Sequence, residues 1–410
     1  MVVIGYKYCH MLYPRKVFSE IQKVILRDES IILTGARQVG KTSLLILLKH
    51  FLEEQGKSCH YFNLENTDHL KMLNEHPYKL FDLIPESKTK QYVCIDEIQY
   101  LDNPTNFLKL LYDEKRLEVK VIASGSSSFY IDKKFKDSLV GRKFLFEIHS
   151  LDFDEFLAFS GQNDLLERKN EKLTAYYEEK LLTLWAQYAR FGGYPKVVLA
   201  EDNEMKKMLL EEIGSAYVKK DIADAGIKSA EKYFFLLKIL ASQTGQLVNA
   251  QELSNTLGIA RKTIEEYLYV MEKSYQICLI KPFYKNIRKE LTKMPKVYFY
   301  DLGLRNFLVN NYEALPKRGD KGAYVENMAF RELLRTAKNI DEVRFWRTQD
   351  KKEVDFVVGD KAYEIKFNAV KKTDKRSYGA FQALYPDIKL QFIADKEILK
   401  IFYQWRMSNN

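Results

Sequence analysis

The chain has 410 residues, 46% of them hydrophobic and 30% charged; this length predicts two or three domains, and the composition excludes collagen, coiled-coil rods and disordered tails. The four cysteines lie far apart and the six histidines form no ligand-like cluster, so we expect neither disulfides nor structural zinc. A net charge of +9 suits a polyanionic partner without requiring one. The sequence contains no apolar run long enough for a bilayer and no signal-peptide core at its start, so we expect a cytoplasmic protein without a membrane partner.

Changes in pattern divide the sequence into four blocks, since it has no fixed-period repeat and no low-complexity stretch. In residues 1–150, short β-branched runs alternate with longer helical patterns, which predicts a parallel α/β sheet. Residues 151–228 have helical spacing and predict a helical lid. Residues 229–312 predict helices followed by basic strands, as in a winged helix, and residues 313–410 predict a small α/β domain.

Residues 35–42, GARQVGKT, match the phosphate-binding motif G-x-x-x-x-G-K-[ST] between a predicted strand, Ile31–Thr34, and a predicted helix, Ser43–Leu52. Glycines let backbone N–H groups close around phosphate oxygens, and the helix N-terminus faces the anion. We expect Lys41 to reach the β- and γ-phosphates and Thr42 to ligate magnesium. The expected nucleotide-binding residues are Gly35, Ala36, Arg37, Gln38, Val39, Gly40, Lys41, Thr42 and Ser43. The expected cofactors are therefore ATP and Mg²⁺.

Two later strands of the first block end in polar residues that suit the same site. The apolar run of residues 92–95 ends in Asp96 and Glu97, as in a Walker B segment. Asp96 would hold magnesium through water, and Glu97 would orient or deprotonate the attacking water. The strand of residues 119–122 is followed by Ser124, which would lie beside the γ-phosphate as a sensor. A plain Ser/Gly turn explains Ser124 equally well.

The segments GARQVGKTS, VCIDEIQ, IASGSSS and LVGRKFLFEIHSLDFDEFL resemble a prokaryotic AAA+ ATPase family that carries a C-terminal domain of unknown function, and this resemblance covers nearly the whole chain. It implies an AAA+ core in residues 1–150. It also implies a catalytic role for Arg142 as a finger or sensor, in cis or, within a homo-oligomer, in trans; a solvated arginine at a strand edge is the alternative. The turn FGGYP at residues 191–195 is similar to a Gly-x-Pro turn of AAA+ relatives, which implies that Pro195 lies near the nucleotide.

Residues 250–268 predict a helix, a tight turn at Gly258 and a second helix, which is a helix-turn-helix pattern. Leu253, Leu257, Ile264 and Leu268 fall on the predicted buried faces. Arg261, Lys262 and Thr263 then stand at the exposed start of the second helix, where we expect DNA contact. From Gly258 to Lys296 the sequence has nine basic and four acidic residues, which favours phosphate contact. Winged helices also serve as protein-docking modules, and that alternative stays open.

The last block predicts a helix from Ala323 to about Lys338 and strands at Glu342–Trp346, Val354–Val358 and Ala362–Phe367. Its acids, in this order of helix and strands, resemble the PD-(D/E)XK nuclease core, although Val354 stands where the name-giving proline would be. The residues that would form a nuclease site are Glu326, Asp355, Glu364 and Lys366. Asp355 and Glu364 would converge on magnesium or manganese ions as a second metal site, with Lys366 beside the attacking water.

The sequence thus predicts an α/β fold with a P-loop AAA+ parallel-sheet ATPase core, a helical lid, a winged helix and a small α/β PD-(D/E)XK-like C-terminal domain. The first hypothesis is an ATPase that couples nucleotide state to a DNA-binding, nuclease-like C-terminal half. The second is a nucleotide-controlled switch that uses an inactive nuclease-like domain for docking. The third is a motor that remodels a protein partner.

Overall fold

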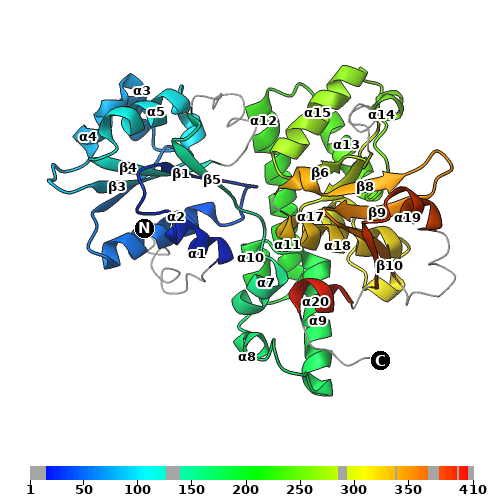
Figure 1. Ribbon diagram of the computed structural model, residues 1–410. Coiled ribbons are helices and arrows are strands. Elements are labelled where there is room, and N and C mark those ends of the chain that lie inside the picture. Colours follow the sequence, from blue (N-terminus) through cyan, green and yellow to red (C-terminus); the bar gives the residue numbers. More distant parts are fainter. Residues whose placement is uncertain are drawn as a thin grey trace. The chain divides into compact units, whose positions relative to one another are not determined.

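The structure is a computed structural model, and it describes residues 15–125, 139–284, 293–337, 339–367, 378–394 and 397–404. The chain divides into two compact units (Figure 1). The first contains the residues before Ser150 together with Lys273–Tyr275, and the second contains Ser150–Glu272 and the residues from Gln276 onward. In the described part of the chain, no helix combines the length and the apolar character that crossing a membrane requires.

The first unit is built on a five-stranded sheet in the order β2-β3-β4-β1-β5, in which every neighbouring pair is parallel. The strands are β1 Ser30–Thr34, β2 Cys59–Asn63, β3 Gln91–Asp96, β4 Val119–Gly125 and β5 Lys143–Glu147. The three central strands are buried throughout, as their continuous apolar runs require in a sheet covered on both faces. This confirms the predicted α/β fold with a P-loop AAA+ core.

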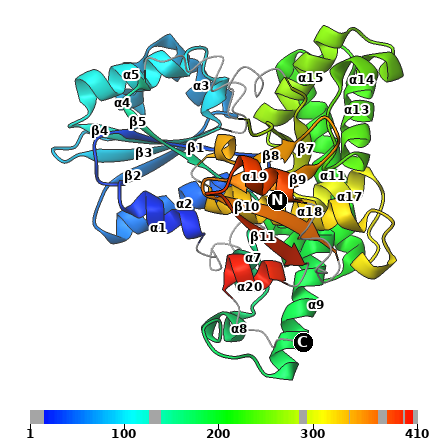
Figure 2. The ribbon, with the colours of Figure 1, turned by 45° about the vertical axis from the view of Figure 1, so that its right-hand side comes forward.

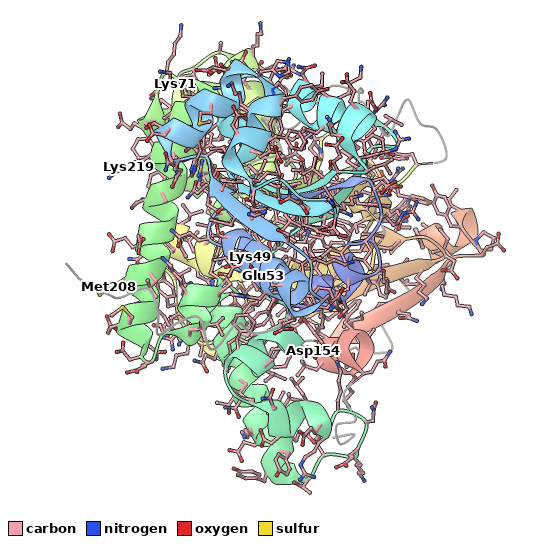
Figure 3. All side chains as sticks on the ribbon, turned by 90° about the vertical axis from the view of Figure 1, so that its left-hand side faces the viewer. Lys49, Glu53, Lys71, Asp154, Met208 and Lys219 are labelled. Carbon is pink, nitrogen blue, oxygen red and sulfur yellow. The ribbon has the colours of Figure 1, made fainter. Side chains whose placement is uncertain are left out.

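Helices cover both faces of this sheet, with α1 and α2 on one side and α3, α4 and α5 on the other (Figures 1 and 2). Their bounds, with the short 3-10 turns, are α1 Lys16–Gln22, α2 Lys41–Glu54, α3 Thr67–Glu75, η1 Pro77–Lys79, α4 Leu80–Leu83, η2 Ile98–Tyr100 and α5 Pro104–Lys115. Leucines at helical spacing bury one face of α2. Its outer face carries the ion pair of Lys49 and Glu53 (Figure 3), whose Nζ and Oε1 lie 2.5 Å apart.

The second unit contains mostly helices in its first half (Figure 1). These are α7 Phe153–Phe159, α8 Asn163–Glu167, α9 Ala175–Phe191, α10 Pro195–Leu199, α11 Asn203–Ala216, the π-helical turn η4 Tyr217–Asp221, α12 Ile222–Ala225, α13 Ala230–Ser242, α14 Ala250–Leu257 and α15 Arg261–Lys273. A capping box at Asp152 starts α7: its carboxylate accepts from the N–H of Glu155, whose side chain accepts from the N–H of Asp152.

Within the described residues, the second half of this unit adds two sheets and six further helical segments. The antiparallel pair is β6 Ile277–Ile280 with β7 Lys296–Phe299, and the second sheet has the order β11-β10-β9-β8. Its strands are β8 Arg344–Arg347, β9 Glu353–Val358, β10 Lys361–Lys366 and β11 Lys389–Ala394. The helical segments are α17 Leu302–Leu308, η5 Leu315–Lys317, α18 Lys321–Thr336, η6 Ile340–Glu342, α19 Gly379–Leu384 and α20 Glu397–Tyr403.

The predicted elements of the last block agree with these to within about two residues, except that a 3-10 turn occupies the start of the first predicted strand.

One hydrophobic core joins the predicted lid to the C-terminal block within this unit. The ring of Phe153 packs on those of Trp185 and Tyr403, with centroids 5.0 Å and 5.7 Å apart. The backbone N–H of Phe153 also donates to the hydroxyl of Tyr403 over 2.9 Å. The first lid helix is therefore packed on the end of the chain, and the division into a lid, a winged helix and a nuclease-like domain stays a prediction.

Candidate functional site

The P-loop follows β1 and leads directly into α2. Gly35 has φ +148°, and a Cβ there would lie 2.0 Å from the carbonyl oxygen of Ile148. Gly40, the residue before α2, has φ 94°. Both glycines are thus needed for the path of the loop, because side chains other than hydrogen rarely tolerate such backbone conformations. The loop leads into the N-terminus of α2, where helix N–H groups favour a bound anion, so this is where we expect the phosphates.

The Lys41 side chain folds back over this loop. Its Nζ donates to the carbonyl oxygens of Gly35 and Ala36 over 2.8 Å and 2.6 Å, and the residue is buried. Arg15 also stabilises the loop: its guanidinium donates to the carbonyl oxygens of Val39 at 2.9 Å and His149 at 2.8 Å. Sequence reasoning missed Arg15, because it lies before the motif and carries no pattern of its own.

The flanking motif residues differ in exposure. Ala36, Arg37 and Val39 are buried, Gln38 is half-buried with φ 61°, and Thr42 and Ser43 are exposed.

Three hydroxyl groups donate to the carboxylate of Asp96 at the end of β3. Thr42 Oγ1 donates to Asp96 Oδ2 over 2.7 Å, and Tyr61 OH donates to the same oxygen over 3.0 Å. Ser124 Oγ donates to Asp96 Oδ1. Parallel strands end at the same edge of a sheet, and this register brings the ends of β2, β3 and β4 to α2.

The predicted magnesium residues Thr42 and Asp96 therefore lie together, and their oxygen atoms fit a hard cation such as Mg²⁺. Tyr61 is a further member that the sequence did not reveal, although its place near the end of β2 next to β3 was a usable signal. Burial, with the charge of Asp96 as the second cause, raises the pKa of Tyr61 well above its usual value. Tyr61 therefore stays protonated and can donate to Asp96.

Glu97 directly follows Asp96 and adopts a left-handed backbone conformation with φ 58°. Its N–H donates to Ser124 Oγ over 3.4 Å, and Gln99 Nε2 donates to its Oε2. Left-handed non-glycine residues tend to occur where the surroundings hold them for function. The arrangement gives Glu97 a fixed place beside the Asp96 cluster, next to the predicted sensor Ser124.

Tyr275 lies in the segment Lys273–Tyr275, which belongs to the first unit although Glu272 before it and Gln276 after it belong to the second. Its hydroxyl lies 2.5 Å from Thr34 Oγ1 and 3.4 Å from Glu147 Oε1. Thr34 is the last residue before the P-loop, so Tyr275 fixes the end of the strand that carries the loop. No sequence motif indicates this contact.

Arg142 lies at the end of the sheet where the strands begin, whereas the P-loop lies where they end. It precedes β5, and its carbonyl oxygen accepts from the N–H of Ser30 at the start of β1. Four residues of strand at about 3.3 Å each separate that edge from the end of β1. The Arg142 side chain pairs with Asp113 on α5, with Nε 2.6 Å from Oδ1. The arginine therefore starts from the end of β5 that lies away from the P-loop of its own subunit. Its role, in cis or in trans, stays a prediction.

The glycines of the FGGYP turn have a packing explanation within the second unit. The N–H of Gly193 donates to Asp301 Oδ2 over 2.9 Å. A Cβ on Gly192 would lie 2.0 Å from Asp301 Oδ1, and one on Gly193 would lie 2.2 Å from the carbonyl oxygen of Leu151. Pro195 occupies the first position of α10, where proline suits a helix start. Its role near the nucleotide stays a prediction.

The helix-turn-helix elements form as predicted, with Gly258 in the left-handed conformation between α14 and α15. The four predicted buried residues, Leu253, Leu257, Ile264 and Leu268, are buried. At the start of α15, Arg261 and Lys262 are exposed and Thr263 is half-buried. Arg261 Nε donates to Glu265 Oε1 over 2.8 Å, which offsets part of its charge.

Only part of the predicted basic stretch is exposed within the described residues. Lys285, Arg288 and Lys289 lie outside the described residues. Lys296, counted with the exposed basic residues of the wing, is only 1% exposed. It cannot contact a phosphate from that position, and the count of basic residues overstated the exposed charge.

Asp355 and Glu364 lie on the neighbouring strands β9 and β10, as expected. Asp355 Oδ2 accepts from the N–H of Ile365 over 2.8 Å, and Lys366 Nζ lies 2.7 Å from Glu364 Oε1. Burial and the charges of Glu326 and Glu364 raise the pKa of Asp355 well above its usual value.

The centre of this cluster holds the ammonium of Lys296. Its Nζ lies 2.5 Å from Glu353 Oε1, 3.0 Å from Glu326 Oε1 and 3.9 Å from Asp355 Oδ1. Among the residues that the structure describes, no group of three or more His, Cys, Asp or Glu side chains is arranged to hold one metal ion. The second metal site expected from Glu326, Asp355 and Glu364 is therefore not supported.

Comparison with known proteins covers the chain in three parts. Residues 27–157 match the family model of an AAA domain. Residues 182–314 and 321–404 match two domains of unknown function, DUF8612 and DUF4143. An uncharacterized protein of Haemophilus influenzae is 29% identical over 346 residues, which cover 82% of this chain and 80% of the relative. An uncharacterized protein of Methanocaldococcus jannaschii is 26% identical over 387 residues, covering 90% and 83%.

Two solved structures resemble the chain only weakly. The Aeropyrum pernix ORC1 protein in complex with DNA has a TM-score of 0.31 at 11% identity and covers 72% of this chain and 91% of that chain. AMPPCP-bound DnaA from Aquifex aeolicus has a TM-score of 0.28 at 16% identity, covering 62% and 86%. The fold of the first unit is therefore assigned from its sheet, its P-loop and its sequence match. It has the fold of a P-loop AAA+ core and is similar to AAA domains.

Proposed function

We propose that the chain binds and hydrolyses ATP with magnesium, and that its nucleotide state controls a C-terminal half that contacts DNA. The observation that carries the nucleotide part is the Asp96 cluster, because it joins the P-loop hydroxyl of Thr42 to the strand ends of β3 and β4 through direct hydrogen bonds. Those are the residue types that a magnesium-nucleotide site requires.

Each residue of the site has a chemical task in this proposal. Lys41 exchanges its bonds to the loop carbonyls for the β- and γ-phosphate oxygens, whose negative charge it compensates. Magnesium, when bound, neutralises charge on the phosphates. Thr42 and Asp96 would hold it, and Ser124 keeps the Asp96 carboxylate in place. Glu97 accepts a hydrogen bond from the attacking water and orients it.

The DNA part rests on the exposed start of α15 and on the excess of positive charge. Arg261 and Lys262 are exposed beside a left-handed turn at Gly258, as in a helix that enters the major groove. Relatives do not supply this function, because they are uncharacterized. The Arg142 side chain enters the proposal only in trans, from a second copy in a homo-oligomer.

A second candidate function is a nucleotide-controlled switch whose C-terminal block docks a partner without cutting DNA. The specific observation in its favour is the Lys296 ammonium among Glu326, Glu353 and Asp355, since a metal-dependent nuclease needs these carboxylates for its ions.

The test measures fluorescence anisotropy of labelled linear, branched and single-stranded DNA with the protein in the absence of nucleotide, with ADP and with ATP, all in magnesium. We expect the protein to bind DNA more tightly in one nucleotide state. We expect the DNA affinity of the double variant Arg261→Ala, Lys262→Ala to fall at least about tenfold. The matched control is Lys238→Ala, at an exposed lysine of α13.

Gels of the same mixtures, repeated with manganese and with Asp355→Ala, report cutting. Cutting that Asp355→Ala removes would establish a nuclease. If the protein hydrolyses ATP but neither binds nor cuts DNA, the DNA part of the proposal is contradicted, and a protein partner is then the remaining candidate.

A further inference from the structure

The C-terminal carboxylates already surround a cation that belongs to the protein. Lys296 is the first residue of β7 and one of the largest fully buried side chains in the described part of the chain. Burial alone disfavours a charged ammonium, but the charges of Glu326, Asp355 and Glu353 outweigh it and raise the pKa of Lys296. The ion pairs with Glu326 and Glu353 hold this ammonium within the cluster.

We infer that Lys296 serves as the cation of this cluster in place of a divalent metal ion, so that the wild-type site does not bind magnesium or manganese. The position of the ammonium is the first reason. A metal bound to Glu326 Oε1 or Glu353 Oε1 would lie about 2.1 Å from that oxygen, while Nζ already lies 3.0 Å and 2.5 Å from the two oxygens. Metal and ammonium would compete for the same space and repel each other.

Protein donors also bind oxygen atoms of Glu326 and Glu353 in this cluster. Tyr298 OH donates to Glu326 Oε1, and Arg347 Nη1 donates to Glu353 Oε2 over 2.5 Å. Gly245 with φ +77° closes the other side of Glu326, because a Cβ there would lie 3.2 Å from Glu326 Oε2. Buried carboxylates are stable only when such partners compensate their charge.

The charge balance supports the same conclusion. Glu326, Glu353 and Asp355 supply three negative charges at most, and Lys296 with Arg347 supplies two positive ones. A metal site with three ionised carboxylates would instead need the two charges of the metal. Lys366, the lysine of the nuclease-like pattern, is paired with Glu364 and is a different residue. The central cation thus comes from outside the pattern, from β7.

This arrangement gives Lys296 a function within the second unit. It ties β7 of the winged-helix-like region to α18 and β9 of the C-terminal block through buried ion pairs. The inference does not depend on ATP or on DNA, so its failure would leave the proposed function untouched.

The test is a titration of the nucleotide-free protein with Mn²⁺. Binding is monitored as the loss of the free-ion signal in electron paramagnetic resonance. The variants are Lys296→Met, which keeps the length of the side chain without its charge, and the double variant Lys296→Met, Asp355→Asn. Ions bound to Thr42 and Asp96 contribute equally in all three proteins and cancel in the comparison.

We expect Lys296→Met to bind one more Mn²⁺ than wild type, at least about tenfold more tightly than the wild type binds any ion at this site. The double variant loses that ion. A wild type that binds one Mn²⁺ more than the double variant would overturn the inference. So would a folded Lys296→Met protein that gains no ion.

If Lys296→Met is too unstable to titrate, thermal unfolding gives the answer. Removal of the ammonium leaves uncompensated buried carboxylates, so Mn²⁺ should raise the melting temperature of the variant and leave that of the wild type unchanged. Equal shifts in both proteins would overturn the inference, and DNA cleavage by the wild type that Asp355→Ala removes would do the same.

Discussion

Lys120 gives the first unit a pH dependence that follows from its surroundings. The side chain lies on β4, is 1% exposed, and donates from Nζ to the carbonyl oxygens of Val24 at 2.9 Å and Arg27 at 2.7 Å. Burial, with the positive charge of Lys90 as a second cause, lowers the pKa of Lys120 from 10.5 to about 7. Folding therefore favours the neutral amine.

Between these two pKa values the unfolded chain binds a proton that the folded protein has released, so the free energy of unfolding rises with pH. The slope approaches about 1.4 kcal/mol per pH unit once the folded lysine is deprotonated. Between pH 7, where the folded lysine is half protonated, and pH 9, the gain is about 2 kcal/mol. Well below pH 7 both states carry the proton, and this contribution no longer changes.

The perturbation is Lys120→Met, which removes the titrating group, and the matched control is Lys109→Met, at an exposed lysine of α5. Urea unfolding of the nucleotide-free proteins is followed by circular dichroism at pH 7 and pH 9. From pH 7 to pH 9, the free energy of unfolding of wild type should rise by about 2 kcal/mol more than that of Lys120→Met. The free energy of unfolding of Lys109→Met should change as in wild type. If the free energies of unfolding of wild type and Lys120→Met differ by the same amount at both pH values, the reasoning is refuted.

Three further predictions concern the nucleotide site. Lys41→Ala and Glu97→Gln should each remove ATP hydrolysis, measured as phosphate release, and unchanged turnover in either purified protein would sink the site assignment. Tyr61→Phe removes one donor to Asp96, worth roughly 1 kcal/mol, so the magnesium concentration for half-maximal hydrolysis should rise about fivefold; a purely structural role would lower the melting temperature and leave that concentration unchanged. Gly35→Ala should lose nucleotide binding in a fluorescent-ATP assay, since its Cβ would meet the Ile148 carbonyl at 2.0 Å, whereas Gly322→Ala, whose Cβ would meet open space without a left-handed backbone, should keep that binding.

The first unit was predictable because its signals are local. β1 and α2 flank a motif whose residues are consecutive in the sequence, and the apolar run of β3 leads straight to Asp96. The place of Arg142 in the sheet was also predictable, because a residue before a parallel strand lies at the end of the sheet opposite to the P-loop, which follows a strand.

Other members of the two sites could not be inferred in this way. Lys296 meets partners 30, 57 and 59 positions later in the sequence, at Glu326, Glu353 and Asp355. A lysine that follows a stretch of basic residues normally predicts an exposed charge, and only the packing of β7 against α18 and β9 reverses that expectation. Arg15 and Tyr275 likewise act through tertiary contacts that leave no pattern in the sequence.

The short segment Lys273–Tyr275 changes what counts as a complete ATPase fragment. A chain ended at His149 keeps every motif of the P-loop and Asp96 strands, yet it lacks the tyrosine that bonds Thr34 and Glu147. Such a fragment would carry a loosened β1 end beneath its phosphate loop. A fragment that keeps this tyrosine contact therefore has to reach residue 275, and so it includes the helix-turn-helix region.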